Sequence, residues 1–452
     1  MDREYTYYEF TESICEKCMK VVPAKIVFKQ DKVYLLKQCK EHGELWNLLE
    51  DDIEYFINKR KYDKPGTISK TQTTYKNGCP YDCGLCTEHD QHSCIYIIEI
   101  TQACNMNCSM CYAKTSRGNS ELSLEKIEEM LDFAQDAENK RAEILQISGG
   151  EPTMHSLVLE IIQMAKDKHF KYVMLNTNGK RIAEDEYFAK SLSEFIGGFE
   201  VYLQFDAVSE KYEALRGEKM LNIKKKAIEN LEKYGIPTTL VCTIVKGIND
   251  DEVGNIISYA LTKNCIRGIN FQPQAFYGDS DYDEIKRITL TKVLVNIEAQ
   301  TKGMIKKSDF IPLPCNVERV AVNYMYRKGS EFIPIVREAN IEKNVHLIDN
   351  TLYVDLEELL KRESEFSGAC CCMISGIAKE FRKLIPANFV NKALSEKIKY
   401  INENTFRISV TSFVDKYNFD KKSIQKECVH VVTEDLRRIP FSAYNMIYRK
   451  KV

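Results

Sequence analysis

The sequence lacks the features of an integral membrane protein, a secreted protein or a nucleic-acid-binding protein. No uninterrupted apolar run in its 452 residues reaches the about 18 that a bilayer-spanning helix needs. The net charge is −2, so no overall field attracts nucleic acid. The first residues, MDREYTYYEF, do not follow the basic-then-apolar pattern of a signal peptide. We therefore expect a cytoplasmic protein with no nucleic-acid partner.

The composition is that of an ordinary globular protein except for its cysteines. Hydrophobic residues make up 44% and charged residues 29%, but there are 17 cysteines. In a long, Lys-rich chain, closely spaced cysteines indicate metal binding more than disulfides. We expect a reducing cytoplasm, and an anaerobic one if the metal is in iron–sulfur clusters.

The pattern along the chain divides it into four regions. We expect an N-terminal metal-ribbon module at 1–75, a Cys-rich connector for an auxiliary cluster at 76–94, a barrel at 95–305 and a C-terminal α+β domain at 306–452. Six β-rich runs alternate with amphipathic helical patterns in the third region; the runs are Ile95–Thr101, Glu143–Ser148, Tyr172–Asn176, Glu200–Phe205, Thr238–Val245 and Gly268–Gln272. This alternation predicts an α/β fold, a partial (β/α)₆ TIM-like barrel with all strand C-terminal ends on one face.

A cysteine triplet follows the first barrel strand. Cys104, Cys108 and Cys111 lie in TQACNMNCSMCYA with Cx₃Cx₂C spacing. Three thiolates can hold three irons of a [4Fe–4S] cluster and leave the fourth iron open to another ligand. A zinc site is the alternative, although zinc sites usually present four ligands.

A glycine-rich turn ends the second expected strand. It contains Gly149, Gly150, Glu151 and Pro152 in the sequence ISGGEP. The glycines allow close approach of the backbone, and Glu151 can accept a hydrogen bond from the ammonium group of an amino acid. A Cx₃Cx₂C loop followed by GGEP resembles the radical S-adenosylmethionine (SAM) superfamily. Met110 departs from the aromatic residue that is common before the third cysteine.

Two other cysteine groups indicate further metal sites. Cys79, Cys83 and Cys86 repeat the Cx₃Cx₂C spacing, with Cys94 as a candidate fourth ligand. Either triplet could in principle bind SAM, but only the one at 104–111 lies on a strand-to-helix loop ahead of GGEP, so the earlier triplet predicts an auxiliary [4Fe–4S] cluster or a zinc site. Two knuckles in the N-terminal region predict a ribbon that binds Zn²⁺ or a single rubredoxin-like iron; they supply Cys15, Cys18, Cys39 and His42. For Cys315, Cys370, Cys371, Cys372 and Cys428, a further cluster and buried apolar thiols stay open as interpretations. Cys242 and Cys265 fall in barrel elements and are expected in the core.

Several other segments are similar to one branch of the superfamily. They are CPYDCGLCTEHDQHSC, YLQFDAVSE with LRG, TIVKGINDDEVGNII, GINFQPQAF and FVDKYNFD…CVHVV…RIPFSAYN. This branch contains archaeal tetraether lipid synthase and 7,8-dihydro-6-hydroxymethylpterin dimethyltransferase. The resemblance implies that polar residues at the strand ends bind SAM: Asn176, Asn178, Gln204, Asp206, Asn249 and Gln272. Turn and cap chemistry is the alternative for these residues. Ser442 departs from the branch, which has cysteine there.

The resemblance implies a mechanism and partners. SAM is cleaved at the open iron, the resulting 5′-deoxyadenosyl radical abstracts hydrogen from an unactivated carbon, and that carbon forms a C–C bond or is alkylated. The partners would be a low-potential electron donor of the flavodoxin or ferredoxin type and a lipid or small-molecule substrate such as a pterin. The basic stretch 374–401 is compatible with peripheral membrane contact as well as with a solvated helix. The alternative to an enzyme is a non-catalytic iron–sulfur or zinc-binding regulator or electron carrier.

Overall fold

The computed structural model describes residues 4–67, 69–108, 110–113, 120–277, 287–329, 331–338, 350–352 and 392–449. Cys370, Cys371, Cys372 and most of the basic stretch 374–401 lie outside these ranges. In the described part, no helix is both long enough and apolar enough to cross a membrane.

The N-terminal module is a four-stranded antiparallel sheet followed by a short helix. Its elements are β1 (Thr6–Ile14), β2 (Val21–Lys29), β3 (Lys32–Cys39), β4 (Gly43–Glu50), α1 (Ile53–Asn58) and the 3₁₀ turn η1 (Lys59–Tyr62). The hydrophobic stretches at Lys25–Lys29 and Val33–Lys37 predict only the two central strands, β2 and β3. The outer strand β1 has mostly exposed or half-buried side chains in its first half, which weakens its hydrophobic pattern.

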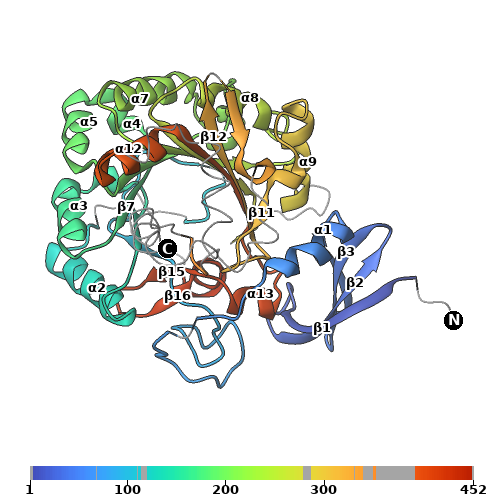
Figure 1. Ribbon diagram of the computed structural model, residues 1–452. Coiled ribbons are helices and arrows are strands. Elements are labelled where there is room, and N and C mark those ends of the chain that lie inside the picture. Colours follow the sequence, from blue (N-terminus) through green and yellow to red (C-terminus); the bar gives the residue numbers. More distant parts are fainter. Residues whose placement is uncertain are drawn as a thin grey trace, which may run out of the picture.

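Six βα units form the predicted partial barrel. The strands are β5 (Ile95–Glu99), β6 (Ile144–Ser148), β7 (Tyr172–Thr177), β8 (Phe199–Gln204), β9 (Thr238–Ile244) and β10 (Ile266–Pro273). The helices are α2 (Leu124–Ala137), α3 (Val158–Asp167), α4 (Lys180–Glu184), α5 (Glu186–Leu192), α6 (Tyr212–Arg216), α7 (Leu221–Lys233), α8 (Val253–Leu261) and α9 (Leu290–Gln300). Neighbouring strands are parallel, and Figure 1 shows the helices as an outer ring around them.

Helix α2 shows why these segments become helices. The Ser123 hydroxyl accepts a hydrogen bond from the Lys126 amide and so caps the first turn. Ile127, Leu131 and Ala134 recur at helical spacing and are fully buried against the sheet. The charged residues between these positions face outward, so the helix covers the sheet with one apolar face.

Strands from the C-terminal region join both edges of this barrel sheet. They are β11 (Ile311–Pro312), β12 (Val320–Lys328), β13 (Glu331–Pro334), β14 (Thr405–Thr411), β15 (Val429–Val432) and β16 (Arg438–Pro440). Strand β14 pairs parallel with β10, and β15 pairs parallel with β5. An open barrel exposes unpaired backbone groups at each edge, and these strands satisfy them. The predicted domain border at residue 306 stays a prediction. Strands from both sides of it belong to one sheet, in which β14 pairs with β10.

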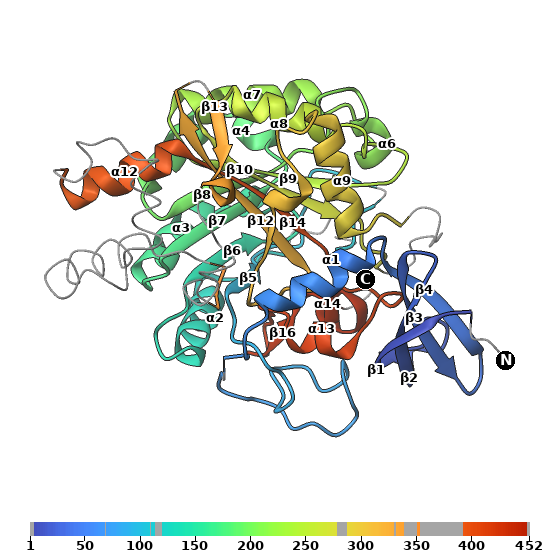
Figure 2. The same ribbon diagram turned by 45° about the vertical axis from the view of Figure 1, so that its right-hand side comes forward.

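The remaining described C-terminal elements contact different parts of the molecule, and one helix packs on β12 while another packs on β1 of the N-terminal module. They are α12 (Leu394–Asn404), α13 (Lys421–Gln425), α14 (Phe441–Ala443) and the π-helical turn η9 (Tyr444–Tyr448). Figures 1 and 2 both place α13 beside the N-terminal sheet. Thr11 of β1 donates a hydrogen bond to Asp420, and the Lys37 ammonium donates to the Lys416 carbonyl oxygen at 2.9 Å. The two ends of the chain therefore share one interface.

Candidate active site and metal centres

The triplet Cys104, Cys108 and Cys111 lies in the loop that follows β5, at the rim where the parallel strands end. All three side chains are partly buried, and their thiols interact electrostatically with one another. Burial raises the pKa of the Cys104 and Cys108 thiols. A bound iron offsets this penalty because it stabilises the thiolates. Three partly buried thiols on one loop suit the predicted iron–sulfur cluster, and that role stays a prediction.

The GGEP turn is bonded directly to this cysteine loop. The Gly150 amide donates to the Thr101 carbonyl oxygen at 2.8 Å, and the Glu151 amide donates to that of Ala103 at 2.8 Å. A Cβ at Gly149 or Gly150 would lie 2.3 Å from one of those two carbonyl oxygens. Both glycines are therefore required by the close approach of two backbone segments.

The Glu151 carboxylate joins the ends of β6 and β7. It accepts hydrogen bonds from the hydroxyls of Thr153 and Thr177, each at 2.7 Å, and from the Asn178 amide at 2.7 Å. The Asn178 side chain in turn donates to Asn105 Oδ1 in the cysteine loop at 2.7 Å. These bonds position the turn, and a contact of Glu151 with the SAM ammonium group stays a prediction.

At the end of β8, Gln204 and Asp206 are connected to the cysteine loop through Arg216. The Arg216 guanidinium donates to both carboxylate oxygens of Asp206, at 2.7 and 3.1 Å, and Gln204 donates to the same carboxylate. Burial alone would lower the pKa of Arg216, but the Asp206 carboxylate raises it above its ordinary value. Arg216 also bonds to Cys108 and partly offsets the rise in that thiol's pKa. Arg216 was missed at the sequence level, although LRG was a visible motif.

The other predicted polar residues have different surroundings. Asn249 is fully buried, and its amide group donates to the Asp206 and Thr243 carbonyl oxygens at 2.9 and 2.8 Å. Its side-chain oxygen accepts a hydrogen bond from the Val245 amide. The Asn249 side chain therefore connects the chain segments at the ends of β8 and β9. Gln272 is half-buried beside Thr243 on the neighbouring strand. Contacts of these residues with SAM stay predictions.

The interior of the barrel is lined largely by polar side chains. Outward residues such as Leu145, Val173 and Val201 pack under the helices, so the alternate residues face inward. Hydrogen bonds connect the inward residues around the axis: Asn176 to Gln146 at 3.4 Å, Asn270 to Tyr202 at 2.5 Å and Ser409 to Asn270 at 3.2 Å. Among the described residues, Asn176 Oδ1 and Glu200 Oε1 are buried acceptors without a hydrogen-bond donor. Buried acceptors are nearly always hydrogen-bonded, so these two atoms are expected to accept hydrogen bonds from water or from a ligand.

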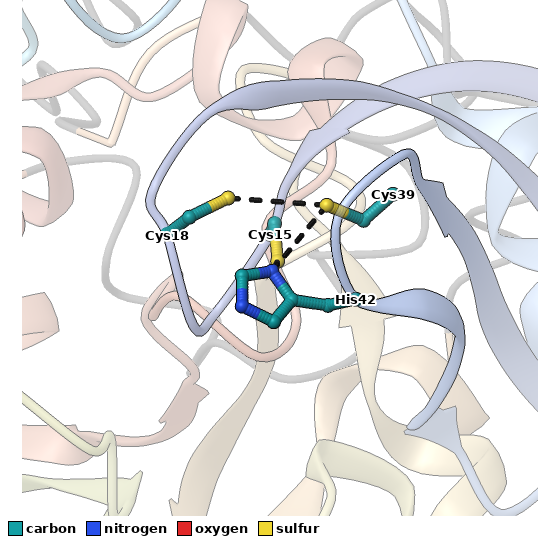
Figure 3. A group of neighbouring side chains, drawn as sticks. All are labelled: Cys15, Cys18, Cys39 and His42. Carbon is teal, nitrogen blue, oxygen red and sulfur yellow. Dashed lines mark hydrogen bonds between the residues drawn. The ribbon is translucent and has the colours of Figure 1, made fainter.

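The N-terminal knuckles bring together all four predicted ligands (Figure 3). His42 Nδ1 lies 3.5 Å from Sγ of both Cys15 and Cys39, and the Cys18 and Cys39 sulfurs are 3.9 Å apart. Burial opposes ionisation of Cys39, but backbone amides and His42 lower the pKa of its thiol to about 6. A compact set of three sulfurs and one nitrogen suits Zn²⁺ or a single iron.

The connector triplet Cys79, Cys83 and Cys86 lines a small cavity with His89 and Pro440. The Asp82 carboxylate fixes the conformation of this loop, because it accepts hydrogen bonds from the backbone amides of residues 76–78 at 2.6 to 3.0 Å. The neighbouring Cys79 thiol and burial raise the pKa of Cys83 well above its ordinary value. The triplet suits the predicted auxiliary cluster, which stays a prediction.

Cys94 lies in a second group of cysteines, and its role as the fourth ligand of the connector triplet stays a prediction. Its ligand atom lies within 4.8 Å of those of Cys315 and Cys428, with all three side chains buried. Because β15 pairs with β5, Cys94 and Cys428 precede neighbouring strands, and the Cys94 amide donates to the Cys428 carbonyl oxygen at 2.8 Å. His92 Nε2 lies 3.6 Å from Cys94 Sγ. Cys242 and Cys265 are core residues, as predicted.

Two family models match parts of this chain, and several known proteins are similar to it. Residues 98–260 match the radical SAM superfamily, and residues 7–51 match the HMPTM N-terminal zinc ribbon domain. A 7,8-dihydro-6-hydroxymethylpterin dimethyltransferase from Methanocaldococcus jannaschii is 35% identical over 98% of this chain and 94% of its own length. A probable GTP 3′,8-cyclase from Pyrococcus abyssi is 26% identical over 57% of this chain and 77% of its own. A crystal structure of Streptococcus suis SuiB aligns with a TM-score of 0.39 and 16% identity over 47% of each chain.

Proposed function

The chain belongs to the radical SAM superfamily, in the family of 7,8-dihydro-6-hydroxymethylpterin dimethyltransferase, and on this premise we propose that it alkylates an unactivated carbon of a pterin-like heterocycle. It is an enzyme of transferase type. The alternative of a non-catalytic regulator or electron carrier is therefore set aside. The family implies SAM, a [4Fe–4S] cluster, a reductant and a substrate.

The rim of the barrel fits these cofactors. Cys104, Cys108 and Cys111 would hold three irons, and the GGEP turn, bonded to their loop, would meet the amino-acid part of SAM. When bound, the cluster and SAM supply a one-electron cleavage that yields a radical able to take hydrogen from a C–H bond. The protein orients SAM through the ends of β6, β7 and β8 and excludes water from the reacting carbon.

The polar interior of the barrel is the observation that favours a pterin-like substrate over a lipid. A lipid chain needs an apolar tunnel, whereas a pterin needs a compact pocket with hydrogen-bonding groups. Asn176, Tyr202, Asn270 and Ser409 offer amides and hydroxyls, and the free acceptors of Asn176 and Glu200 suit a ligand with N–H donors. Burying an alkyl chain against them would leave polar groups unsatisfied.

We further propose roles for the remaining metal sites. The N-terminal group would bind Zn²⁺ or a single iron as a structural centre. The connector triplet, and separately the group of Cys94, Cys315 and Cys428, would bind auxiliary iron–sulfur clusters. An electron donor of the flavodoxin or ferredoxin type would supply the low-potential electron.

The test is transfer of deuterium from substrate to cofactor product. The enzyme would be reconstituted anaerobically, reduced with dithionite and incubated with SAM and deuterated 6-hydroxymethyl-dihydropterin or a deuterated lipid. We expect deuterium in 5′-deoxyadenosine with the pterin, because hydrogen abstraction carries the label into the nucleoside.

The lipid incubation is the matched control for that experiment. Mass spectrometry of 5′-deoxyadenosine distinguishes the two substrates because unlabelled nucleoside reports uncoupled cleavage. Label from the lipid and none from the pterin would reject the proposed substrate. No release of 5′-deoxyadenosine under any condition would reject the use of SAM by this protein.

A further inference from the structure

Helix α7 carries three consecutive lysines with different surroundings. Lys225 and Lys226 are exposed, whereas Lys224 has no exposed surface. It lies on the inner face of the helix with Ala227 and Ile228, which belong to the core. Burial of an ammonium group is costly unless its donors are satisfied, so this position requires an explanation.

The Lys224 ammonium joins the ends of two barrel strands. Its Nζ donates to the Asn178 carbonyl oxygen and to Gln204 Oε1, each at 2.5 Å. Asn178 follows β7 directly, and Gln204 is the last residue of β8. The ring of Tyr212 lies 6.0 Å from the same nitrogen. Lys224 thus fixes the spacing of two strand ends at the rim that carries the cysteine loop.

This contact also helps to fix the orientation of the Gln204 amide. The Asp206 carboxylate only accepts, so the Gln204 NH₂ group must point to it, and the Gln204 oxygen then faces the Lys224 Nζ, which donates to it. Asp206 in turn receives the Arg216 guanidinium, which reaches Cys108. One continuous set of hydrogen bonds therefore leads from Lys224 to the cysteine loop.

We propose that Lys224 is a positioning residue for SAM, which acts through Gln204 by holding its amide in the orientation that the cofactor meets. This inference rests on the proposed function, because it requires SAM at this rim. It needs no particular substrate. The groups that face Lys224 are Asp206, Glu151, Arg216 and Cys108. Two are carboxylates, which favour a cation there, although burial lowers the pKa of Lys224 to about 7.

The experiment compares SAM binding by the reconstituted variants Lys224→Met, Lys224→Arg, Lys225→Met and Gln204→Ala and by the double variant Lys224→Met/Gln204→Ala. We expect the dissociation constant for SAM to rise about tenfold in Lys224→Met, because a hydrogen bond from a charged donor is lost. Lys225→Met is the matched control and should bind SAM like the wild type. Lys224→Arg keeps the charge and the hydrogen-bond donors, so it should bind SAM much more tightly than Lys224→Met and almost as tightly as the wild type.

The double variant separates positioning from a merely structural role. If Lys224 acts through Gln204, the double variant binds SAM no more weakly than Gln204→Ala alone. A further tenfold loss in the double variant would overturn the proposal, as would wild-type affinity in Lys224→Met. Iron and sulfide contents verify that each variant holds its clusters, and if Lys224→Met is poorly folded, Lys224→Gln, which also lacks the charged donor, replaces it in both the single and the double variant. Failure of the wild type to bind SAM would reject the proposed function itself.

Discussion

Cys108 and Cys242 have the same side chain and belong to the same barrel, but their surroundings differ. Cys108 is half-buried in the loop after β5, where Arg216 partly offsets the rise in pKa that burial causes. Cys242 is fully buried on the outer face of β9, and burial raises its pKa well above the ordinary value. A cysteine binds metal as its thiolate, so only the first position suits an iron ligand.

Replacing each of these two cysteines by alanine should distinguish an iron ligand from a residue that only packs in the core. We expect Cys108→Ala to abolish 5′-deoxyadenosine release while the metal of the N-terminal group stays bound. Cys242→Ala should keep the release and lower the free energy of unfolding by ~1 kcal/mol, because it leaves only a small cavity. Nucleoside release by chromatography and urea unfolding provide the two measurements. Retained release in Cys108→Ala would reject the assignment of the triplet.

At the scale of elements, the loops after β5 and β6 form one unit. Two backbone hydrogen bonds join them, and neither glycine of the GGEP turn has room for a side chain. The cysteine loop therefore takes its shape from a neighbouring turn about forty residues further along the chain.

The variant Gly150→Ala should disturb the cluster site through this contact. Its Cβ would meet the Ala103 carbonyl oxygen at 2.3 Å, so the cysteine loop must move. We expect reconstituted protein to lose the iron of about one cluster. Gly235→Ala is the control: its φ of +65° is strained, but nothing lies within 4 Å of its Cβ, so it should cost ~1 kcal/mol of stability and no iron. Equal iron in both variants would contradict the coupling of the loops.

Local patterns predicted the barrel and the ligand groups that are close in sequence. Helices such as α2 repeat apolar residues at helical spacing, and the knuckles of Cys15 and Cys39 are short loops. Contacts that depend on long-range strand pairing could not be predicted in this way. Cys94 meets Cys428 only because β15 lies beside β5, and no local signal encodes that pairing. Lys224 was missed because its neighbours in the KKK run are exposed and the sequence does not distinguish them.

At the scale of the whole molecule, the N-terminal sheet is held against the C-terminal segment around α13. Lys421 forms an ion pair with Glu12 at 2.8 Å, and the buried ammonium of Lys37 bonds to Glu16 at 3.0 Å as well as to the Lys416 carbonyl oxygen. The four-ligand group lies at one end of this small sheet. Its metal would stabilise the module and, through the module, the C-terminal segment.

Removing the metal of this group should loosen the interface without stopping SAM cleavage. We expect Cys39→Ser to lose the metal and to increase amide hydrogen exchange in residues 6–50 and 416–422 by at least about tenfold, because the small sheet loses its bound ion. Release of 5′-deoxyadenosine should persist. Lys40→Ser, next to the same knuckle, is the control. Unchanged exchange in residues 416–422 would show that the interface does not depend on the metal.

The pairing of β15 with β5 also determines when the barrel edge at β5 can form during synthesis of the chain. The ribosome releases Cys94 early, but Cys428 and the strand that completes that edge follow only after more than three hundred further residues. Until then β5 has an unpaired edge and Cys94 lacks its neighbour Cys428. A metal at the site proposed for Cys94, Cys315 and Cys428 would therefore enter only after translation. A prematurely terminated chain could carry the SAM motifs intact and still be unable to complete that centre.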